Sequence, residues 1–361
     1  MRKQTRQIQL GRVAVGGDAP ISIQSMCNTD TRDVAATIGQ IHALEQAGCE
    51  IIRCAVPDMN AAEALSAIRA EISIPLIADI HFDYQLALAS LEAGVEGLRL
   101  NPGNIGAEWK VAEVVKVCAE RNVPIRIGVN GGSLEKSLLE KYGHATAAAM
   151  VESALGHIRI LEGLNFEQIK VSLKASDVRR TVDAYRLLAE EVDYPLHIGV
   201  TEAGTTWSGT IKSAIGLGSL LLDGLGDTLR VSLTGDPVEE VRVGWEILKS
   251  LELRERGPVF VSCPTCGRCE IDLIEIAEEV ERRLHDLPQK LTIAVMGCVV
   301  NGPGEAREAD LGIAGGRGQG LLFRNGETLR KVPQRELADA LVEEAWRMVK
   351  DRDAERETRD A

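Results

Sequence analysis

Four cysteines in the last third of the sequence have a spacing that could hold a metal centre. Cys263, Cys266 and Cys269 lie within seven residues of one another, and Cys298 follows further along the chain. Thiolates at such spacing form four-cysteine zinc sites, and they also hold [4Fe–4S] clusters. The spacing alone therefore leaves zinc and an iron–sulfur centre as two open alternatives.

A second group of chemically capable residues is basic, and each member lies in or directly after a short aliphatic segment. The group consists of Arg53, Arg99, Arg126, Lys174 and Arg230. If the segments are parallel strands of one sheet, the five cations meet at one edge. Arginine matches phosphate oxygens bidentately, so this edge predicts a phosphorylated, multiply charged ligand. The competing interpretation is that each cation pairs with a nearby carboxylate, such as Glu202 or Asp79.

Other polar side chains occupy equivalent positions after the same segments. Carboxylates beside several arginines can be oriented for proton transfer, so Asp79 and Glu202 are candidate catalytic residues. His81 is either a structural hydrogen-bonding residue or a third catalytic candidate. The neutral side chains at these positions are Asn101, Asn130 and Ser232.

The scaffold that positions these residues is a repeated strand, loop and helix unit. Strands are expected at 21–26, 50–56, 75–80, 96–101, 123–129, 168–173, 195–201 and 227–233, with alanine-rich helical stretches between them. Eight such units predict an α/β chain with a (β/α)8 TIM barrel, in which chemistry gathers at the carboxyl ends of the strands. A doubly wound open sheet is the alternative, but its glycine fingerprint is missing.

After about residue 250 the pattern changes to a helix, a strand, glycine-rich strands and a final helix. We expect a barrel over residues 1–240, a linker over 241–258 and a smaller α+β domain over 259–361 that contains the clustered cysteines.

Composition limits the class of protein. The net charge of −13 argues against nucleic acid as the main partner. The basic N-terminal segment lacks the apolar stretch of a signal peptide, and no apolar run reaches the length of a membrane span. The chain is therefore predicted to be cytoplasmic and free of membrane segments. In a reducing compartment, clustered cysteines favour metal over disulfides.

Several ordered motifs resemble one enzyme family over nearly the whole chain. SCPTCGR (262–268) and MGCVVNGPGEA (296–306) are similar to the two cluster motifs of the 4-hydroxy-3-methylbut-2-enyl diphosphate synthase family. That family acts in the penultimate step of the methylerythritol phosphate route to isoprenoids. The barrel motifs that resemble it, in the same order, are DIHF (79–82), RLNPGNIG (99–106), IRIGVNGGSLE (125–135), VSLKASDV (171–178), GVTEAG (199–204) and LRVSLTGDP (229–237).

The resemblance implies a [4Fe–4S] cluster held by three cysteines and one glutamate. The matching positions are Cys263, Cys266, Cys298 and Glu305. A carboxylate is a hard, exchangeable ligand that can leave one iron open to substrate, which four thiolates would not do. Cys269 departs from the family pattern and could in principle replace Glu305.

The resemblance also implies a substrate and partners. The substrate would be 2-C-methyl-D-erythritol 2,4-cyclodiphosphate, which undergoes reductive dehydration and ring opening. The matching barrel positions are Arg53, Arg99, Asn101, Arg126, Asn130, Lys174, Glu202, Arg230 and Ser232. Electrons would come from ferredoxin or flavodoxin, and Glu202 is our candidate for proton delivery. Family members form head-to-tail homodimers with cross-chain active sites.

Two functions from other classes remain as alternatives. One is a phosphate-binding barrel with a structural zinc ribbon and no redox activity. The other is a non-redox barrel transferase for a phosphorylated, pterin-like substrate, which would leave the clustered cysteines unexplained.

Overall fold

The computed structural model describes residues 2–285, 287, 289–298, 304 and 308–360, without the side chains of residues 355–360. The chain divides into two compact units, Met1–Arg254 and Glu255–Ala361. The domain bounds expected from the sequence stay predictions, although residues 241–250 of the expected linker belong to a helix of the first unit.

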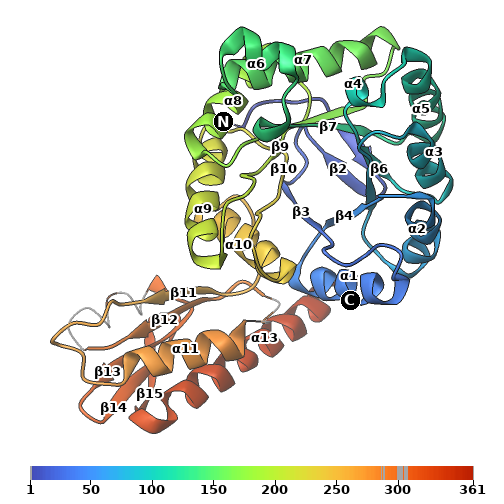
Figure 1. Ribbon diagram of the computed structural model, residues 1–361. Helices are drawn as coiled ribbons and strands as arrows, with labels where there is room; N and C mark the ends of the chain where they lie inside the picture. Colours follow the sequence, from blue (N-terminus) through green and yellow to red (C-terminus); the bar gives the residue numbers. More distant parts are fainter. Residues whose placement is uncertain (1, 286, 288, 299–303, 305–307, 361) are drawn as a thin grey trace. The chain divides into compact units, whose positions relative to one another are not determined.

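The first unit is a barrel of eight parallel strands surrounded by helices (Figure 1). A parallel bridge between Val171 and Leu196 joins the ends of the strand order. The TIM barrel expected from the sequence is therefore confirmed. In chain order the strands are β3 (Ser22–Met26), β4 (Ile51–Ala55), β5 (Leu76–Asp79), β6 (Gly97–Arg99), β7 (Ile125–Asn130), β8 (Ile169–Lys174), β9 (His197–Ile198) and β10 (Thr228–Leu229).

The helices that cover the barrel begin at well-formed caps. Aspartate side chains at 33, 58, 83, 177 and 236 accept hydrogen bonds from backbone N–H groups in the first turns of α1, α2, α3, α8 and α10. These caps fix where each helix begins relative to the strand before it. The helices are α1 (Val34–Ala47), α2 (Met59–Glu71), α3 (Tyr84–Glu92), α4 (Pro102–Ile105), α5 (Glu108–Arg121), α6 (Lys136–Tyr142), α7 (Ala147–Gly163), α8 (Val178–Glu191), α9 (Thr206–Leu222) and α10 (Pro237–Ser250).

An N-terminal hairpin closes the floor of the barrel. Strands β1 (Ile8–Leu10) and β2 (Val13–Val15) pair antiparallel. Their side chains form an apolar cluster with Ile51 and Ile77, which lie in the amino-terminal halves of β4 and β5. This hairpin is not among the elements predicted from the sequence.

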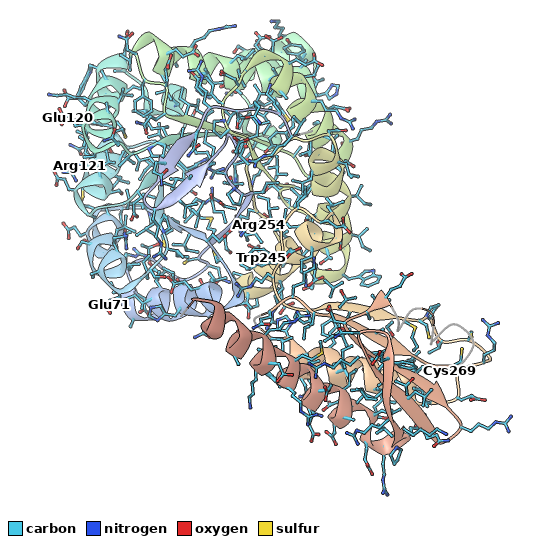
Figure 2. The ribbon with its side chains drawn as sticks, turned by 180° about the vertical axis from the view of Figure 1, so that it is seen from behind. Glu71, Glu120, Arg121, Trp245, Arg254 and Cys269 are labelled. Carbon is cyan, nitrogen blue, oxygen red and sulfur yellow. The ribbon has the colours of Figure 1, made fainter. Side chains whose placement is uncertain are left out.

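The end of the first unit is fixed to the barrel. Figure 2 shows Trp245 of α10 beside Arg254, whose guanidinium carbon lies 4.9 Å from the indole ring centre. Arg254 also forms an ion pair of 3.0 Å with Glu50. These contacts hold the chain on the barrel up to the boundary between the units.

The second unit is the expected smaller α+β domain. Its sheet has the order β11-β12-β13-β14-β15, with β11, β12 and β13 parallel. Helices α11 and α13 pack on one face of this sheet and enclose an apolar core. The elements are β11 (Val259–Ser262), α11 (Leu273–Leu284), β12 (Thr292–Met296), β13 (Leu311–Gly316), β14 (Gln319–Arg324), β15 (Glu327–Pro333) and α13 (Leu337–Asp360). Within the described residues, no helix is long and apolar enough to cross a membrane.

Candidate active site

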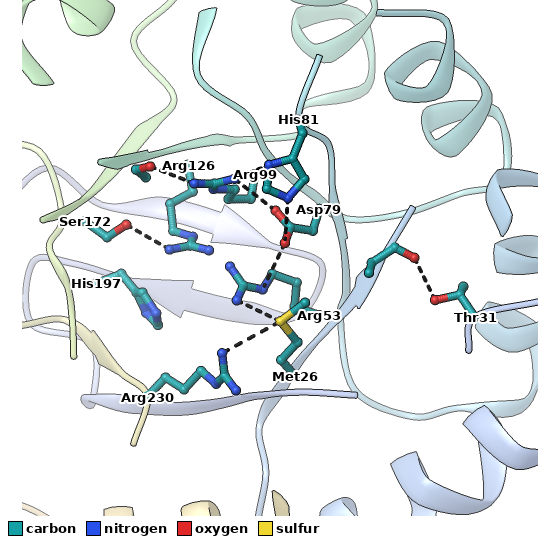
Figure 3. Close-up of polar contacts among 12 residues, drawn as sticks. Met26, Thr31, Arg53, Asp79, His81, Arg99, Arg126, Ser172, His197 and Arg230 are labelled. Atoms are coloured by element: carbon teal, nitrogen blue, oxygen red, sulfur yellow. Dashed lines mark hydrogen bonds and ion pairs between the residues drawn. The ribbon is translucent and has the colours of Figure 1, made fainter. Parts of the chain in front are cut away.

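The carboxyl ends of the barrel strands bring most of the expected basic residues together (Figure 3). Asp79, Arg99 and Arg126 lie on three neighbouring strands and are successive register partners. Arg53 lies on β4, Lys174 ends β8, and Arg230 directly follows β10. Parallel strands place these positions at one face of the barrel, as the sequence predicted.

Asp79 is the carboxylate at the centre of this face. Its oxygens lie 3.4 Å from Arg99, 4.0 Å from Arg53 and 3.7 Å from His81. Burial alone would raise the pKa of Asp79, but the charge of Arg53 and the contact with His81 hold it well below its ordinary value. Asp79 therefore remains ionised at neutral pH and can orient the neighbouring cations, but its low pKa makes it a weak proton acceptor. His81 is exposed beside it.

Arg126 is buried with unused hydrogen-bonding capacity. Its Nη1 donates to Ser172 Oγ at 2.8 Å, whereas Nε and Nη2 have no hydrogen-bond partner in the described part of the chain. Burial and the positive charges of Arg53 and Arg99 lower the pKa of Arg126. A buried guanidinium with free donors is strongly stabilised when an anion reaches it.

Lys174 has a similar environment at the end of β8. Its Nζ lies 3.2 Å from His197 Nε2. Burial and the charges of Arg126 and Arg230 lower the pKa of Lys174. An anionic ligand beside the ammonium group would favour the protonated form.

Arg230 has a carboxylate partner that the sequence analysis missed. Glu240, a buried residue of α10, accepts three hydrogen bonds of 3.2 to 3.3 Å from the guanidinium and one of 2.9 Å from the Leu233 N–H. The expected partner for such a cation was Glu202 or Asp79. Glu240 lies on a helix, so the pattern of residues at strand ends does not predict it.

Among the expected neutral and acidic residues, Asn101 is fixed by hydrogen bonds to the backbone, whereas Asn130, Ser232 and Glu202 are partly or fully exposed. Asn101 exchanges two hydrogen bonds, of 2.8 and 3.0 Å, with the backbone of Gly128, so its amide fixes the loop after β6 against β7. Asn130 and Ser232 are half-buried at the ends of β7 and just after β10. Glu202 is exposed in the loop before α9 and has a left-handed backbone conformation, with φ of 52°.

A polar layer lies inside the barrel in addition to the expected residues. Lys170 is the register partner of Arg126 and is 1% exposed, and its Nζ has no hydrogen-bond partner among the described residues. Buried His197 contacts Thr228 Oγ1 at 2.8 Å in addition to Lys174. Strand alternation could have identified Lys170 and Ser172, because both alternate with apolar residues along β8 as Lys174 does.

Three cysteines of the second unit, Cys263, Cys269 and Cys298, lie near the carboxyl ends of the parallel strands β11 and β12. Cys263 follows β11 and Cys298 lies two residues after β12, and these strands pair in parallel. The Gly297 N–H donates to Cys263 Sγ at 3.3 Å. Cys269 Sγ also lies near Gly297, because a Cβ at that position would be 2.5 Å from it. Cys266 is exposed and Cys298 is buried.

The thiols fit a sulfur-ligated metal centre by donor chemistry, and Cys263 and Cys298 both follow strands that end at the same side of the sheet. Within the described ranges, no three histidine, cysteine, aspartate or glutamate side chains are already gathered closely enough to hold a metal ion. Glu305, the expected fourth ligand, lies outside the described residues.

Comparisons with known proteins match both units. Residues 5–245 match the GcpE TIM-barrel domain, and residues 259–347 match the GcpE protein C-terminal domain. A protein of Geobacter sulfurreducens named 4-hydroxy-3-methylbut-2-en-1-yl diphosphate synthase (flavodoxin) is 72% identical, over 97% of this chain and 99% of its own. A protein of Clostridium perfringens with the same name is 60% identical, over 94% and 98%.

Among solved structures, dihydropteroate synthase from Stenotrophomonas maltophilia has a TM-score of 0.50. The likeness covers 69% of this chain and 98% of that one, at 13% sequence identity. At this identity the likeness concerns the barrel fold alone.

Proposed function

The chain belongs to the GcpE family of 4-hydroxy-3-methylbut-2-en-1-yl diphosphate synthases, and from this premise we propose how its own residues carry out the reaction. It is an oxidoreductase that converts 2-C-methyl-D-erythritol 2,4-cyclodiphosphate into 4-hydroxy-3-methylbut-2-enyl diphosphate. The reaction consumes two electrons and two protons and releases water. The family matches do not support a phosphate-binding barrel with a zinc ribbon.

The diphosphate of the substrate binds at the barrel face that carries the excess of buried cations. Arg126 supports this assignment most directly, since two of its nitrogens have no hydrogen-bond partner in the described part of the chain. Lys174 and Arg53 add charge beside it, and Asp79 orients Arg99. Asn130 and Ser232 supply neutral hydrogen bonds at the edge of the same face. Binding the diphosphate here holds the carbon chain of the substrate at the carboxyl ends of the barrel strands.

Cys263, Cys266, Cys298 and Glu305 would hold a [4Fe–4S] cluster, which would supply the two electrons of the reduction one at a time. The thiols at the ends of β11 and β12 support this ligand set. Glu202 delivers a proton to the departing hydroxyl, because its exposed position in a strand-end loop lets it exchange protons with solvent between turnovers. Asp79 keeps its negative charge throughout.

We propose flavodoxin as the electron donor, because the names of the two relatives include it. Ferredoxin is the alternative donor. The substrate-binding cations and the cysteines lie in different compact units. We propose that a homodimer joins them, with the second unit of one copy closing the barrel of the other.

The test is anaerobic purification followed by turnover with reduced flavodoxin. We expect a brown protein that contains iron and converts the cyclic diphosphate into the linear allylic diphosphate. A colourless protein that contains zinc and gives no product would overturn the proposal. In the same preparation, Cys298→Ser should lose the iron and Cys269→Ser should keep it. Iron lost from Cys269→Ser would instead favour four cysteine ligands.

A further inference from the structure

His197 on β9 contacts the ammonium group of Lys174 inside the barrel. Lys174 Nζ lies 3.2 Å from His197 Nε2, and both side chains are buried. Burying a polar group costs free energy unless it is hydrogen-bonded, and the cost is larger for a charged group. His197 therefore supplies a hydrogen bond that a buried ammonium group requires.

This contact determines which nitrogen of His197 carries the ring proton. An ammonium group only donates hydrogen bonds, so Nε2 has to accept, and the ring proton then lies on Nδ1. Nδ1 is 2.8 Å from the hydroxyl oxygen of Thr228, the register partner of His197 on β10, which accepts this second hydrogen bond. Burial and the charges of Lys174 and Arg126 lower the pKa of His197, so the ring stays neutral and Nε2 remains an acceptor.

The surroundings restrict both side chains to one arrangement. The Tyr185 hydroxyl donates to the His197 carbonyl at 2.5 Å and accepts from the Leu173 N–H at 3.1 Å, which ties β9 to the end of β8. A Cβ at Gly199 would lie 2.7 Å from Lys174 Nζ, so the lysine side chain occupies space that only glycine leaves open. The position of the ammonium group therefore depends on the residues of β9.

A second buried lysine of β8 shows what the histidine contact adds. Lys170 lies on the same face of the strand, and its Nζ has no hydrogen-bond partner among the described residues. Burial and the charge of Arg126 lower the pKa of both lysines. Of the two, Lys174 has an acceptor for its protonated form, and Lys174 is also the one at the carboxyl end of the strand.

We propose that His197 is a positioning residue for the diphosphate: its neutral Nε2 accepts one N–H of the Lys174 ammonium group and directs the other two towards the phosphate oxygens. The inference deepens the proposed function and rests on it, because it requires that Lys174 binds the diphosphate. The same hydrogen bond favours the charged form of Lys174. Other groups act on this charge through space; Arg126, Arg230 and Arg53 disfavour it, and Glu240 favours it.

The experiment measures binding of the cyclic diphosphate by calorimetric titration over a range of pH. His197→Leu should weaken binding about tenfold or more, because Lys174 loses a hydrogen bond to its charged form. The pH above which affinity falls should also become lower, since protonated Lys174 is less favoured. His197→Gln, whose side-chain carbonyl can accept the same N–H, should retain most of the affinity. The matched control is His42→Leu at an exposed position of α1, which should bind as the wild type does.

A double-mutant cycle separates positioning from a merely structural role. In the Lys174→Ala background, His197→Leu should cause no further loss of affinity, whereas independent contributions would add. Additive losses would overturn the inference, as would unchanged affinity and pH dependence in His197→Leu. A wild type that does not bind the cyclic diphosphate would refute the proposed function itself, and with it this inference.

Thr228→Val keeps the test decisive if His197→Leu does not fold. Valine has nearly the volume of threonine but no hydroxyl group, so the Nδ1–H of His197 loses its acceptor. Affinity should fall roughly two- to tenfold, and the pH profile should shift in the same direction as in His197→Leu. Circular dichroism checks the fold, and unchanged binding by a folded Thr228→Val protein would overturn the inference.

Discussion

At the scale of single residues, the face of the barrel at the carboxyl ends of its strands, which we call the barrel mouth, has more positive than negative charge. Asp79 is shared among Arg53, Arg99 and His81, and Glu240 neutralises only Arg230. Arg126 and Lys174 have no ion pair in the described part of the chain, and burial lowers the pKa of both. An anion that binds at the barrel mouth would therefore compensate this excess positive charge.

The first prediction tests this charge. Arg126→Ala or Lys174→Ala should weaken substrate binding at least tenfold, because removing one partner of a buried charged contact costs about 2–5 kcal/mol. Affinity should also fall as pH rises, since Lys174 loses its proton at a lower pH than an ordinary lysine. Calorimetric titration with the cyclic diphosphate measures both effects. Arg179→Ala on the exposed face of α8 is the control, and equal affinity in all three variants would contradict the assignment.

Lys170 leads to a prediction about stability. Burial and the charge of Arg126 lower its pKa in the folded chain. Lys170→Met should stabilise the protein by about 1–4 kcal/mol at neutral pH, because it removes a buried polar group that lacks a partner.

The pH dependence of this gain has a defined sign. Between the lowered folded pKa of Lys170 and its ordinary unfolded value, the unfolded chain binds more protons. Wild-type stability therefore rises with pH across this window, and the advantage of Lys170→Met shrinks. Urea unfolding at several pH values measures the difference, and a gain that grew with pH would contradict this account.

The polar residues also show what sequence patterns can predict. The positions of Arg53, Arg99, Arg126, Lys174 and Arg230 at strand ends are predictable, because strand alternation and βα repetition fix where such side chains point. Glu240 is not predictable in this way, since no local pattern tells which helix carboxylate reaches back into the barrel. Lys170 and Ser172, which lie deeper in the barrel, were not predicted because only Lys174, the last inward-facing residue of β8, was taken as a site residue.

At the scale of elements, all eight barrel strands lie within or beside their expected ranges, and most are shorter. The barrel strands are predictable because each is a short aliphatic segment bounded by glycine or another turn residue. The hairpin of β1 and β2 is not predictable in this way, because three-residue strands are too short to show a period. Its position depends on tertiary contact with Ile51 and Ile77, which local sequence does not encode.

Strand β7 gives a prediction at this scale. A Cβ added at Gly128 would lie 2.6 Å from Arg99 Nε, at the far end of a flexible side chain. Gly128→Ala should therefore fold but displace the Arg99 guanidinium from the Gly128 carbonyl and from Asp79. We expect the KM for the cyclic diphosphate to rise about tenfold, since a lost charge-assisted hydrogen bond costs roughly 1.5–3 kcal/mol.

The control for this variant is Gly132→Ala, which meets nothing within 4 Å. Circular dichroism should show both variants folded. An unchanged KM in Gly128→Ala would mean that the position of Arg99 does not matter for binding.

At the scale of the whole molecule, the division of chemistry between two units predicts complementation. Glu202→Gln and Cys298→Ser should each be inactive as homodimers. If each site is shared between two chains, as proposed, one site of a heterodimer combines an intact barrel with an intact cluster unit. Random mixing gives about half heterodimers, each with one good site of two, so activity should recover to roughly a quarter of wild type. If each chain closes its own barrel, heterodimers confirmed by mass spectrometry will show no recovery.

The apolar floor that β1 and β2 form under the barrel limits the routes by which substrate can enter and product can leave. Ile8, Leu10 and Val15 cover the amino-terminal side of the strands, opposite the cationic mouth. Product then departs by the route along which the next substrate arrives, so the two exclude each other. We therefore expect accumulated product to inhibit turnover competitively with the cyclic diphosphate.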